Sequence, residues 1–310
     1  MSHITPLRFL VILISLMLVV QAAPTHAVQA AAACPSPAIA VKTGQSDERL
    51  TVQGLNRRYL LYIPATYDPK LPTPLVFSIH GFASNPEQQQ AYSHWETVAD
   101  KEPLIVVYPQ GTGLPSRWNA GDSSYIGAST VDDVGFLRQV VATISETVCI
   151  DPTRIYVSGL SNGGGMSNRM ACQASDMIAA MGSVAGAYSP VDCKITRPVP
   201  VIAFHGTTDP IVDYHGNASQ NFPDIASWAK EWAERDGCSL TPAKIAATGD
   251  ASGIRYTNCK DDAEVVLYTI DDGGHTWPGG GLEFGFLGKT SKDIDATAVM
   301  WDFFKQHPMK

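Results

Sequence analysis

The sequence contains few charged residues and no cluster of positive ones, which argues against a nucleic-acid binding protein. Only 17% of the 310 residues are charged, and the formal net charge is −8 at pH 7. Lysine and arginine form no basic run, so the chain lacks the positive surface that a nucleic-acid phosphate backbone requires. No internal repeat or low-complexity tract occurs. With 45% hydrophobic residues, the composition is that of a globular protein that buries one large core.

The apolar stretch near the start of the chain is too short to span a bilayer comfortably. It runs from Phe9 to Val20, Arg8 precedes it, and small residues follow it. This layout predicts a signal peptide at residues 1–27, followed by a linker at residues 28–47. We therefore expect a secreted protein, extracellular or periplasmic, with no membrane association after cleavage. An uncleaved membrane anchor is the alternative.

The cysteines do not have the spacing of metal ligands. No pair forms Cys-x-x-Cys and no histidine is interleaved with them, so we expect no metal site. An even number, six, in an exported protein favours disulfides. Their order along the chain predicts the pairs Cys238–Cys259 and Cys172–Cys193, which leaves Cys34 to pair with Cys149.

Strand and helix signals alternate from about residue 48 to the end, which is typical of a mostly parallel sheet with helices on both faces. Short apolar runs predict strands at 58–63, 75–79, 104–108, 154–158, 181–184, 200–204 and 265–270. Helical signals occur at 86–100, 130–148, 162–172, 224–236 and 293–306. Residues 110–128 predict a long loop, and residues 240–258 a hairpin-like excursion. No linker divides this region, so we expect one α/β domain over residues 48–310.

A serine stands at a predicted junction between a strand and a helix. Gly159-Leu-Ser-Asn-Gly163 fits the Gly-x-Ser-x-Gly pattern, between a strand that ends at Ser158 and a helix that begins at Asn162. Such a turn projects the serine hydroxyl above the sheet edge, and glycines on both sides avoid collisions in it. The pattern predicts that Ser161 is a nucleophile. The alternative is a glycine-rich turn with a bystander serine.

A serine nucleophile needs a base, and in the α/β-hydrolase fold the acid and then the histidine follow it in the chain. His307 lies in the terminal tail, and His215 lies in the same loop as the candidate acids. His275 remains, in a loop directly after the predicted strand at 265–270. We therefore expect His275 to be the general base.

The acid has several candidates. Asp209 comes early in the loop after the strand at 200–204, and Pro210 fixes the turn that follows it. Asp213 is its rival, and Asp271 or Asp272 are remote alternatives. We expect Asp209 to orient the base.

An oxyanion hole needs two backbone N–H donors. The residue after the nucleophile supplies one, here Asn162, and the loop after the strand at 75–79 supplies the other. We expect the second donor to be Phe82. His80 and His205 more simply brace the ends of their strands.

Five motifs in order resemble the polyhydroxybutyrate depolymerase and feruloyl esterase family. They are Ile79-His-Gly-Phe, Val131-Asp-Asp-Val-Gly-Phe136, Arg154-Ile-Tyr-Val-Ser-Gly-Leu-Ser-Asn-Gly-Gly164, His205-Gly-Thr-Thr-Asp209 and Gly274-His-Thr-Trp-Pro278. The resemblance covers residues 48–305 and implies an extracellular serine esterase without metal or organic cofactor. It carries nucleophile, acid and base onto Ser161, Asp209 and His275.

The resemblance leaves the substrate open. It implies hydroxycinnamate esters of plant polysaccharide, polyhydroxyalkanoate or acetylated xylan as the ester. Trp118, Tyr214 and Trp277 lie in predicted loops and are expected to flank the acyl group, unless they only pack those loops. A serine peptidase of the same fold and a catalytically silent binding module are the alternatives to an esterase.

Overall fold

The computed structural model describes residues 1, 34–35, 41–123, 126–127 and 129–310. The expected signal peptide, apart from Met1, lies outside these residues. Within the described part of the chain, no helix combines the length and the apolar character needed to cross a membrane.

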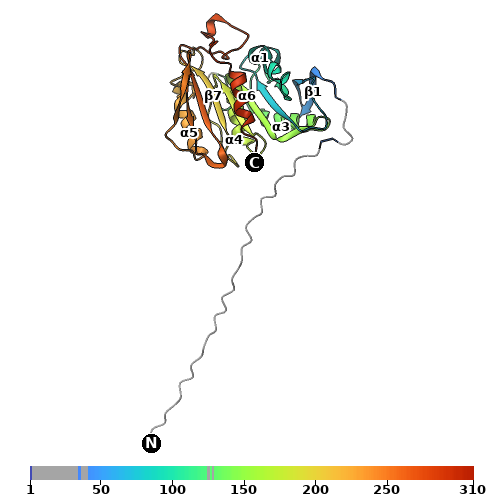
Figure 1. Ribbon diagram of the computed structural model, residues 1–310, viewed down its shortest axis with the longest axis horizontal. Helices are drawn as coiled ribbons and strands as arrows, with labels where there is room; N and C mark the ends of the chain where they lie inside the picture. The colour runs from blue at the N-terminus through green and yellow to red at the C-terminus, as the bar shows by residue number, and fades with distance from the viewer. Residues whose placement is uncertain (2–33, 36–40, 124–125, 128) are drawn as a thin grey trace. The chain divides into compact units, whose positions relative to one another are not determined.

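The described residues form one sheet of ten strands, in the order β1-β2-β4-β3-β5-β6-β7-β10-β9-β8. The six strands from β4 to β10 in this order run parallel, and antiparallel pairs flank them at both edges (Figure 1). The strands are β1 Gly44–Val52, β2 Leu55–Ile63, β3 Thr73–Ile79, β4 Ile105–Pro109, β5 Ile150–Gly159, β6 Ala180–Val184, β7 Val201–Gly206, β8 Ala243–Thr248, β9 Ala251–Tyr256 and β10 Val265–Ile270.

Six α-helices in the described residues cover the sheet (Figure 1). They are α1 Pro86–Ser93, α2 Trp95–Ala99, α3 Asp133–Ser145, α4 Asn162–Gln173, α5 Ile225–Arg235 and α6 Ala296–Lys305. Four begin after a side chain that accepts a hydrogen bond from a backbone N–H three residues on, which satisfies a donor that the helix leaves unpaired. These N-caps are Asn85, Asp132, Asp224 and Asp295.

The central strands are buried on both faces because their side chains alternate between two separate apolar clusters. In β3, Leu75 and Phe77 pack with α3, α4 and α5, whereas Val76 packs with α1, α2 and α6. The same alternation holds in β5, where Val157 and Tyr156 belong to opposite clusters. A parallel sheet covered on both faces follows, and the carboxyl ends of its strands meet at one edge, where ligand sites form in open α/β sheets.

The sequence predictions place these elements well but miss two details. The predicted helix at 86–100 is interrupted at His94, whose φ of 49° is left-handed, so it forms α1 and α2. Strand β1, Gly44–Val52, was not predicted: residues 44–47 were expected in the linker 28–47, and the whole strand pairs with β2.

All three predicted disulfides are present: Cys34–Cys149, Cys172–Cys193 and Cys238–Cys259. The described residues include no free cysteine. The Cys34–Cys149 bond ties a segment before β1 to the residue just before β5.

Candidate active site

Ser161 lies two residues after the end of β5 and directly before the first residue of α4. Its backbone has φ 58° and ψ −119°, a strained combination for a residue with a side chain. Its N–H donates to the Val184 carbonyl at the end of β6, and its carbonyl accepts from Ala187 N–H at 3.0 Å. The surrounding sheet therefore holds this sharp turn in place.

Two glycines are required by the crowding of this turn. A Cβ on Gly159 would lie 2.3 Å from the Gly163 carbonyl oxygen, and one on Gly163 would lie 2.1 Å from the Ile79 carbonyl oxygen. A Cβ on Gly81 would lie 3.3 Å from Ser161 Cβ, so the loop after β3 passes directly beside the serine. The Gly-x-Ser-x-Gly pattern thus has a steric basis in this chain.

Asp209 and His275 meet at the carboxyl ends of β7 and β10, two neighbouring parallel strands. His275 Nδ1 lies 2.8 Å from Asp209 Oδ2, and both side chains are buried. Asp209 Oδ1 accepts the N–H groups of Ile211 and Val212, each at 2.8 Å. This arrangement fixes the imidazole so that Nδ1 faces the carboxylate and Nε2 is left for another partner.

The charge of Asp209 is stabilised although the group is buried. Burial alone would raise its pKa, but the hydrogen bond with His275, the nearby His205 and the Val212 N–H outweigh burial and leave the pKa below its ordinary value. His205 Nε2 lies 3.4 Å from Asp209 Oδ2 and donates to the Val212 carbonyl at 2.8 Å. The position of His205 at a strand end predicts only a bracing role, and its contact with Asp209 was not predicted.

The loop that carries His275 is held mainly by its backbone. His275 N–H donates to the Leu287 carbonyl at 2.6 Å, and Gly274 N–H donates to the Lys289 carbonyl at 2.9 Å. Trp277 Nε1 donates to Thr297 Oγ1, which anchors the loop to α6.

The residues expected to form an oxyanion hole lie on either side of Ser161. The side chain of Asn162 is clamped, because its Oδ1 accepts from Trp118 N–H at 2.8 Å and its Nδ2 donates to the Trp118 carbonyl at 3.3 Å. Trp118 Nε1 also donates to the His80 carbonyl at 3.0 Å, one residue before Gly81 and two before Phe82. One tryptophan thus connects both segments that flank the serine.

His80 braces its loop, as expected. Its Nε2 accepts from Gly111 N–H at 2.9 Å, and its Nδ1 donates to the Gly81 carbonyl at 2.7 Å. Burial lowers the pKa of His80 to about 4, so the ring is neutral at pH 7 and acts as a structural connector.

A buried ion pair supports the loop that carries Trp118. Arg57 Nη2 lies 2.8 Å from Asp133 Oδ1, and both side chains are almost fully buried. Asp133 Oδ2 accepts from Asn119 N–H at 2.8 Å, directly after Trp118, and the Arg57 guanidinium lies 3.8 Å from the centre of the Phe136 ring. Asp133 therefore supports the loop that follows Trp118, whereas the side chain of the adjacent Asp132 caps α3.

Among the described residues, no hydrogen bond joins Ser161 Oγ to the His275 ring. The sheet topology nevertheless brings all three segments to one edge, because Ser161 follows β5, Asp209 follows β7 and His275 follows β10. Catalytic hydrogen bonds of this kind are often long without substrate and tighten in the complex.

The rival residues are placed elsewhere by the structure. Asp213 is exposed and accepts from His215 N–H, while Asp271 and Asp272 are exposed on the turn after β10. His215 is 80% exposed. Among the described residues, no three His, Cys, Asp or Glu side chains are grouped to hold a metal ion.

The aromatic residues expected to flank the substrate are largely unavailable for that role. Trp118 and Trp277 are each 1% exposed and their indole N–H groups are hydrogen-bonded inside the protein, so both belong to the core, which corrects the expectation. Tyr214 is half-buried, and its hydroxyl hydrogen-bonds Thr269 Oγ1 at 2.8 Å. Predicted loop positions did not reveal this packing.

A small apolar cluster lies among the loops at this edge of the sheet. Phe82 and Ile211, both partly buried, pack against a buried group that consists of Ile126, Ala187, Val212 and Phe222. Ala187 donates to the Ser161 carbonyl, and Phe82 belongs to the loop beside the serine, so this cluster borders Ser161. Four of its six members are buried, which leaves Phe82 and Ile211 as its partly accessible part.

Comparisons with known proteins show similarity to esterases. Feruloyl esterase B of Piromyces equi is 33% identical over 245 residues, which are 74% of this chain and 45% of that protein. The bifunctional acetylxylan esterase/xylanase XynS20E of Neocallimastix patriciarum is 33% identical over 162 residues, 52% of this chain and 23% of that protein. The chain thus spans less than half the length of either relative.

The fold has a counterpart among solved structures. The acetyl xylan esterase from Aspergillus awamori superposes with a TM-score of 0.60 at 17% identity and covers 84% of this chain and 99% of its own. This likeness establishes the α/β-hydrolase fold. Residues 57–213, half of the chain, match the family model described as esterase PHB depolymerase. The chain therefore belongs to the PHB depolymerase family of esterases.

Proposed function

We propose that this protein is a secreted serine esterase that hydrolyses carboxylic esters through an acyl-enzyme on Ser161. The observation that carries the proposal is the buried contact of 2.8 Å between Asp209 and His275, at the same sheet edge as the strained Ser161 turn. Three disulfides and the family membership support an exported esterase.

Acylation begins when His275 Nε2 accepts the Ser161 hydroxyl proton while Oγ attacks the ester carbonyl carbon. Asp209 keeps Nδ1 protonated and stabilises the imidazolium that forms. The negative charge on the carbonyl oxygen is stabilised by the backbone N–H groups of Asn162 and Phe82. The imidazolium then donates its proton to the alcohol oxygen as the ester C–O bond breaks.

Deacylation repeats these steps with water. His275 takes a proton from the water as its oxygen attacks the acyl carbon, and the same two N–H groups stabilise the second oxyanion. Collapse returns the proton to Ser161 Oγ and releases the carboxylic acid. No cofactor takes part in this sequence of steps.

The proposed substrate is a hydroxycinnamate ester of a plant polysaccharide. The relatives named feruloyl esterase and acetylxylan esterase support an ester of a polysaccharide. Phe82 and Ile211, the partly buried members of the apolar cluster, suit an aromatic acyl group better than acetate.

The central test uses Ser161→Ala with methyl ferulate. We expect loss of activity by at least about 10⁴-fold and an unchanged circular dichroism spectrum, because the substitution removes only the nucleophile. Retained turnover would show that another residue performs the attack. A fluorophosphonate probe should label the native protein and not the variant, whereas a silent binding module would stay unlabelled in both.

A polyester such as polyhydroxyalkanoate is the second candidate substrate. The observation in its favour is the exposed pair Phe284 and Phe286, 40% and 74% exposed, on the segment whose Leu287 carbonyl holds His275. Release of hydroxyalkanoate from a polymer film, lost in the double variant Phe284→Ser with Phe286→Ser, would support this candidate. Digestion of a peptide library would instead reveal a peptidase.

A further inference from the structure

A cavity of about 450 Å³ lies between α4, α5 and two connecting segments, and it contains none of Ser161, Asp209 and His275. The segments are residues 188–191, which follow β6, and residues 218–223, which precede α5. Its volume is within the range of small-ligand sites in proteins. The mechanism does not use it.

The cavity borders the catalytic edge of the sheet. Tyr188 and Ser189 line it, and Ala187, the residue before them, donates to the Ser161 carbonyl at 3.0 Å. Phe222 lines it and also belongs to the apolar cluster beside the nucleophile. A long ligand with its ester at Ser161 could therefore place a distant, non-reacting part here.

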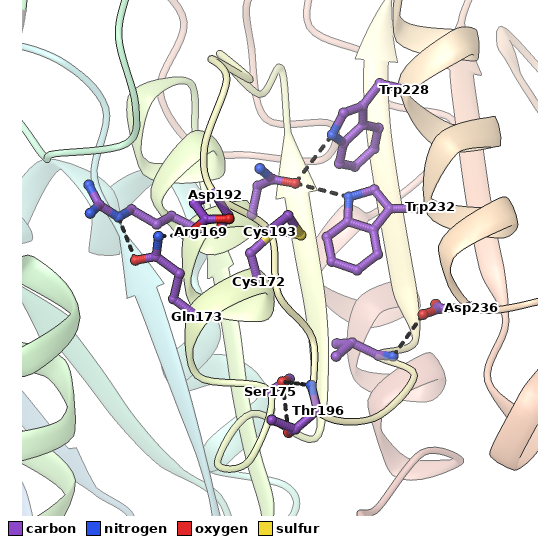
Figure 2. The surroundings of a disulfide bond; sticks show 12 residues. Arg169, Cys172, Gln173, Ser175, Asp192, Cys193, Thr196, Trp228, Trp232 and Asp236 are labelled. Atoms are coloured by element: carbon purple, nitrogen blue, oxygen red, sulfur yellow. Dashed lines mark hydrogen bonds between the residues drawn. A yellow bond between two sulfur atoms is a disulfide. The ribbon is translucent and has the colours of Figure 1, made fainter.

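Aromatic side chains form one side of the cavity. The Tyr188 and Trp228 rings are stacked with their centres 3.7 Å apart, and Trp232 follows one helical turn later on α5. Trp228 and Trp232 donate from Nε1 to the same acceptor, Asn168 Oδ1 on α4, at 3.2 and 2.9 Å (Figure 2).

This pair of bonds uses only the oxygen of the Asn168 amide. Because Oδ1 of Asn168 accepts two indole N–H groups, the other end of the amide is its NH₂ group. Asn168 is 6% exposed and lines the cavity, and no hydrogen bond within the described residues engages Nδ2. An NH₂ group on a residue that lines the cavity suits a ligand hydroxyl or ether oxygen.

The rim of the cavity carries one charge of each sign. Glu231 is exposed and Arg235 is half-buried, and both line the cavity from α5. Although they are four residues apart, neither forms an ion pair within the described part of the chain; Arg235 instead lies 4.7 Å from the centre of the Trp232 ring. Opposite charges that do not pair favour a neutral ligand with both donors and acceptors.

The wall opposite α5 is fixed to α4. Cys172 on α4 is bonded to Cys193, and Gln173 Nε2 donates to the Asp192 carbonyl at 3.2 Å. Thr196 N–H donates to Ser175 Oγ at 2.8 Å farther along the same segment (Figure 2). The segment at residues 192–196 is therefore cross-linked to α4 and to the residues that follow it, which favours a preformed site.

We propose that this cavity is a subsite for neutral sugar residues of the polysaccharide whose ester is cleaved at Ser161. Apolar atoms of the cavity wall pack against the C–H face of a sugar ring, while Asn168, Glu231 and Arg235 hydrogen-bond its hydroxyls. A polyester offers no hydroxyls along its chain, and a small acyl group would not reach beyond Ser161. The inference rests on the proposed function, because it assigns the alcohol part of that substrate.

Binding is tested first without catalysis, by calorimetric titration of the Ser161→Ala protein with a linear, unesterified xylo-oligosaccharide. Added Glu231→Ala should weaken binding about 10-fold, as expected for one hydrogen bond to a charged group. Ala218→Trp, which fills the cavity from an exposed rim position, should abolish binding. Glu234→Ala is the matched control, since Glu234 is exposed on α5 and does not line the cavity.

Turnover then links the cavity to the reaction. In protein with Ser161 intact, Glu231→Ala should lower about 10-fold the ratio of kcat/KM for a feruloylated xylo-oligosaccharide to kcat/KM for methyl ferulate. Glu234→Ala should leave this ratio unchanged.

Two results would overturn the subsite. One is the absence of measurable oligosaccharide binding to the Ser161→Ala protein, and the other is an equal effect of Ala218→Trp on both esters. If the native enzyme cleaves neither ester, the proposed function fails, but calorimetry still decides whether the cavity binds sugar.

Discussion

The two sides of the candidate active site are held in place by different means. On the side of Ser161, the proposed nucleophile, the buried side chains of Arg57 and Asp133 pair, and those of Asp133 and Asn162 bind the backbone N–H groups of Asn119 and Trp118. On the base side, His275 lies on a loop whose position depends on backbone hydrogen bonds to residues 287 and 289.

This difference matches the demands of the proposed chemistry. An oxyanion hole stabilises developing charge only if its N–H groups are already oriented, so a rigid core support suits it. The base must exchange protons with serine, alcohol and water in turn, and a loop position tolerates small adjustments. Substitutions on the two sides should therefore separate stability from activity.

The largest effect is expected on the base side, from Asp209→Asn. The amide retains the shape but no longer stabilises the correct imidazole tautomer, so kcat should fall about 10⁴-fold with little change in melting temperature. The assay is methyl ferulate hydrolysis with a thermal scan. Asp213→Asn, in the same loop and exposed, serves as the control and should remain active.

On the nucleophile side, Asp133→Asn should act on stability first. It leaves the Arg57 charge buried without its partner, which costs about 3–5 kcal/mol in the free energy of unfolding by urea. The neighbouring Asp132→Asn keeps the helix cap and should cost about 0.5 kcal/mol or less. Equal losses in the two variants would refute the supporting role of the buried pair.

A third prediction concerns the pH dependence of stability and a residue on neither side of the site, Asp236. Burial raises the pKa of Asp236 to about 7, whereas the unfolded value is 3.8. The folded state thus holds a proton that the unfolded state loses, so this group's stabilising contribution is complete below pH 3.8 and disappears as pH rises through 7. The decline amounts to at most about 4 kcal/mol.

Urea unfolding of native protein and Asp236→Asn between pH 4.5 and pH 8 (about the span over which this proton is lost) measures that contribution. The variant mimics the protonated carboxyl and should have a flatter pH dependence than the native protein. Parallel curves would show that Asp236 titrates normally.

The smallest effect is expected from His205→Phe, which keeps a ring but removes Nε2, the donor to the Val212 carbonyl and the atom 3.4 Å from Asp209 Oδ2. As a positioning change it should lower kcat about 10-fold, by roughly 1.4 kcal/mol, and leave KM nearly unchanged. His215→Phe, at an exposed position, controls for loss of a histidine. A larger change in KM than in kcat would contradict this role.

The comparison also shows what the sequence could and could not predict. Asp209 and His275 each follow a predicted strand. Because parallel strands bring their carboxyl ends together, these positions were enough to predict the contact between the two residues. The roles predicted for Trp118 and Trp277 were wrong because the sequence does not indicate which other segment covers an aromatic residue in a loop. Asn168 could not be recognised either, since its two indole partners lie about 60 residues away.

The disulfide from Cys34 to Cys149 has a practical consequence. It holds the start of the domain at the amino-terminal edge of the sheet, beside the entry to β5, and Met309 N–H donates to the Thr153 carbonyl at the same edge. Cys34 and Met309 thus lie on the side of the sheet away from Ser161. Immobilising the protein through its carboxyl terminus should therefore leave the edge that carries Ser161 accessible to a large substrate.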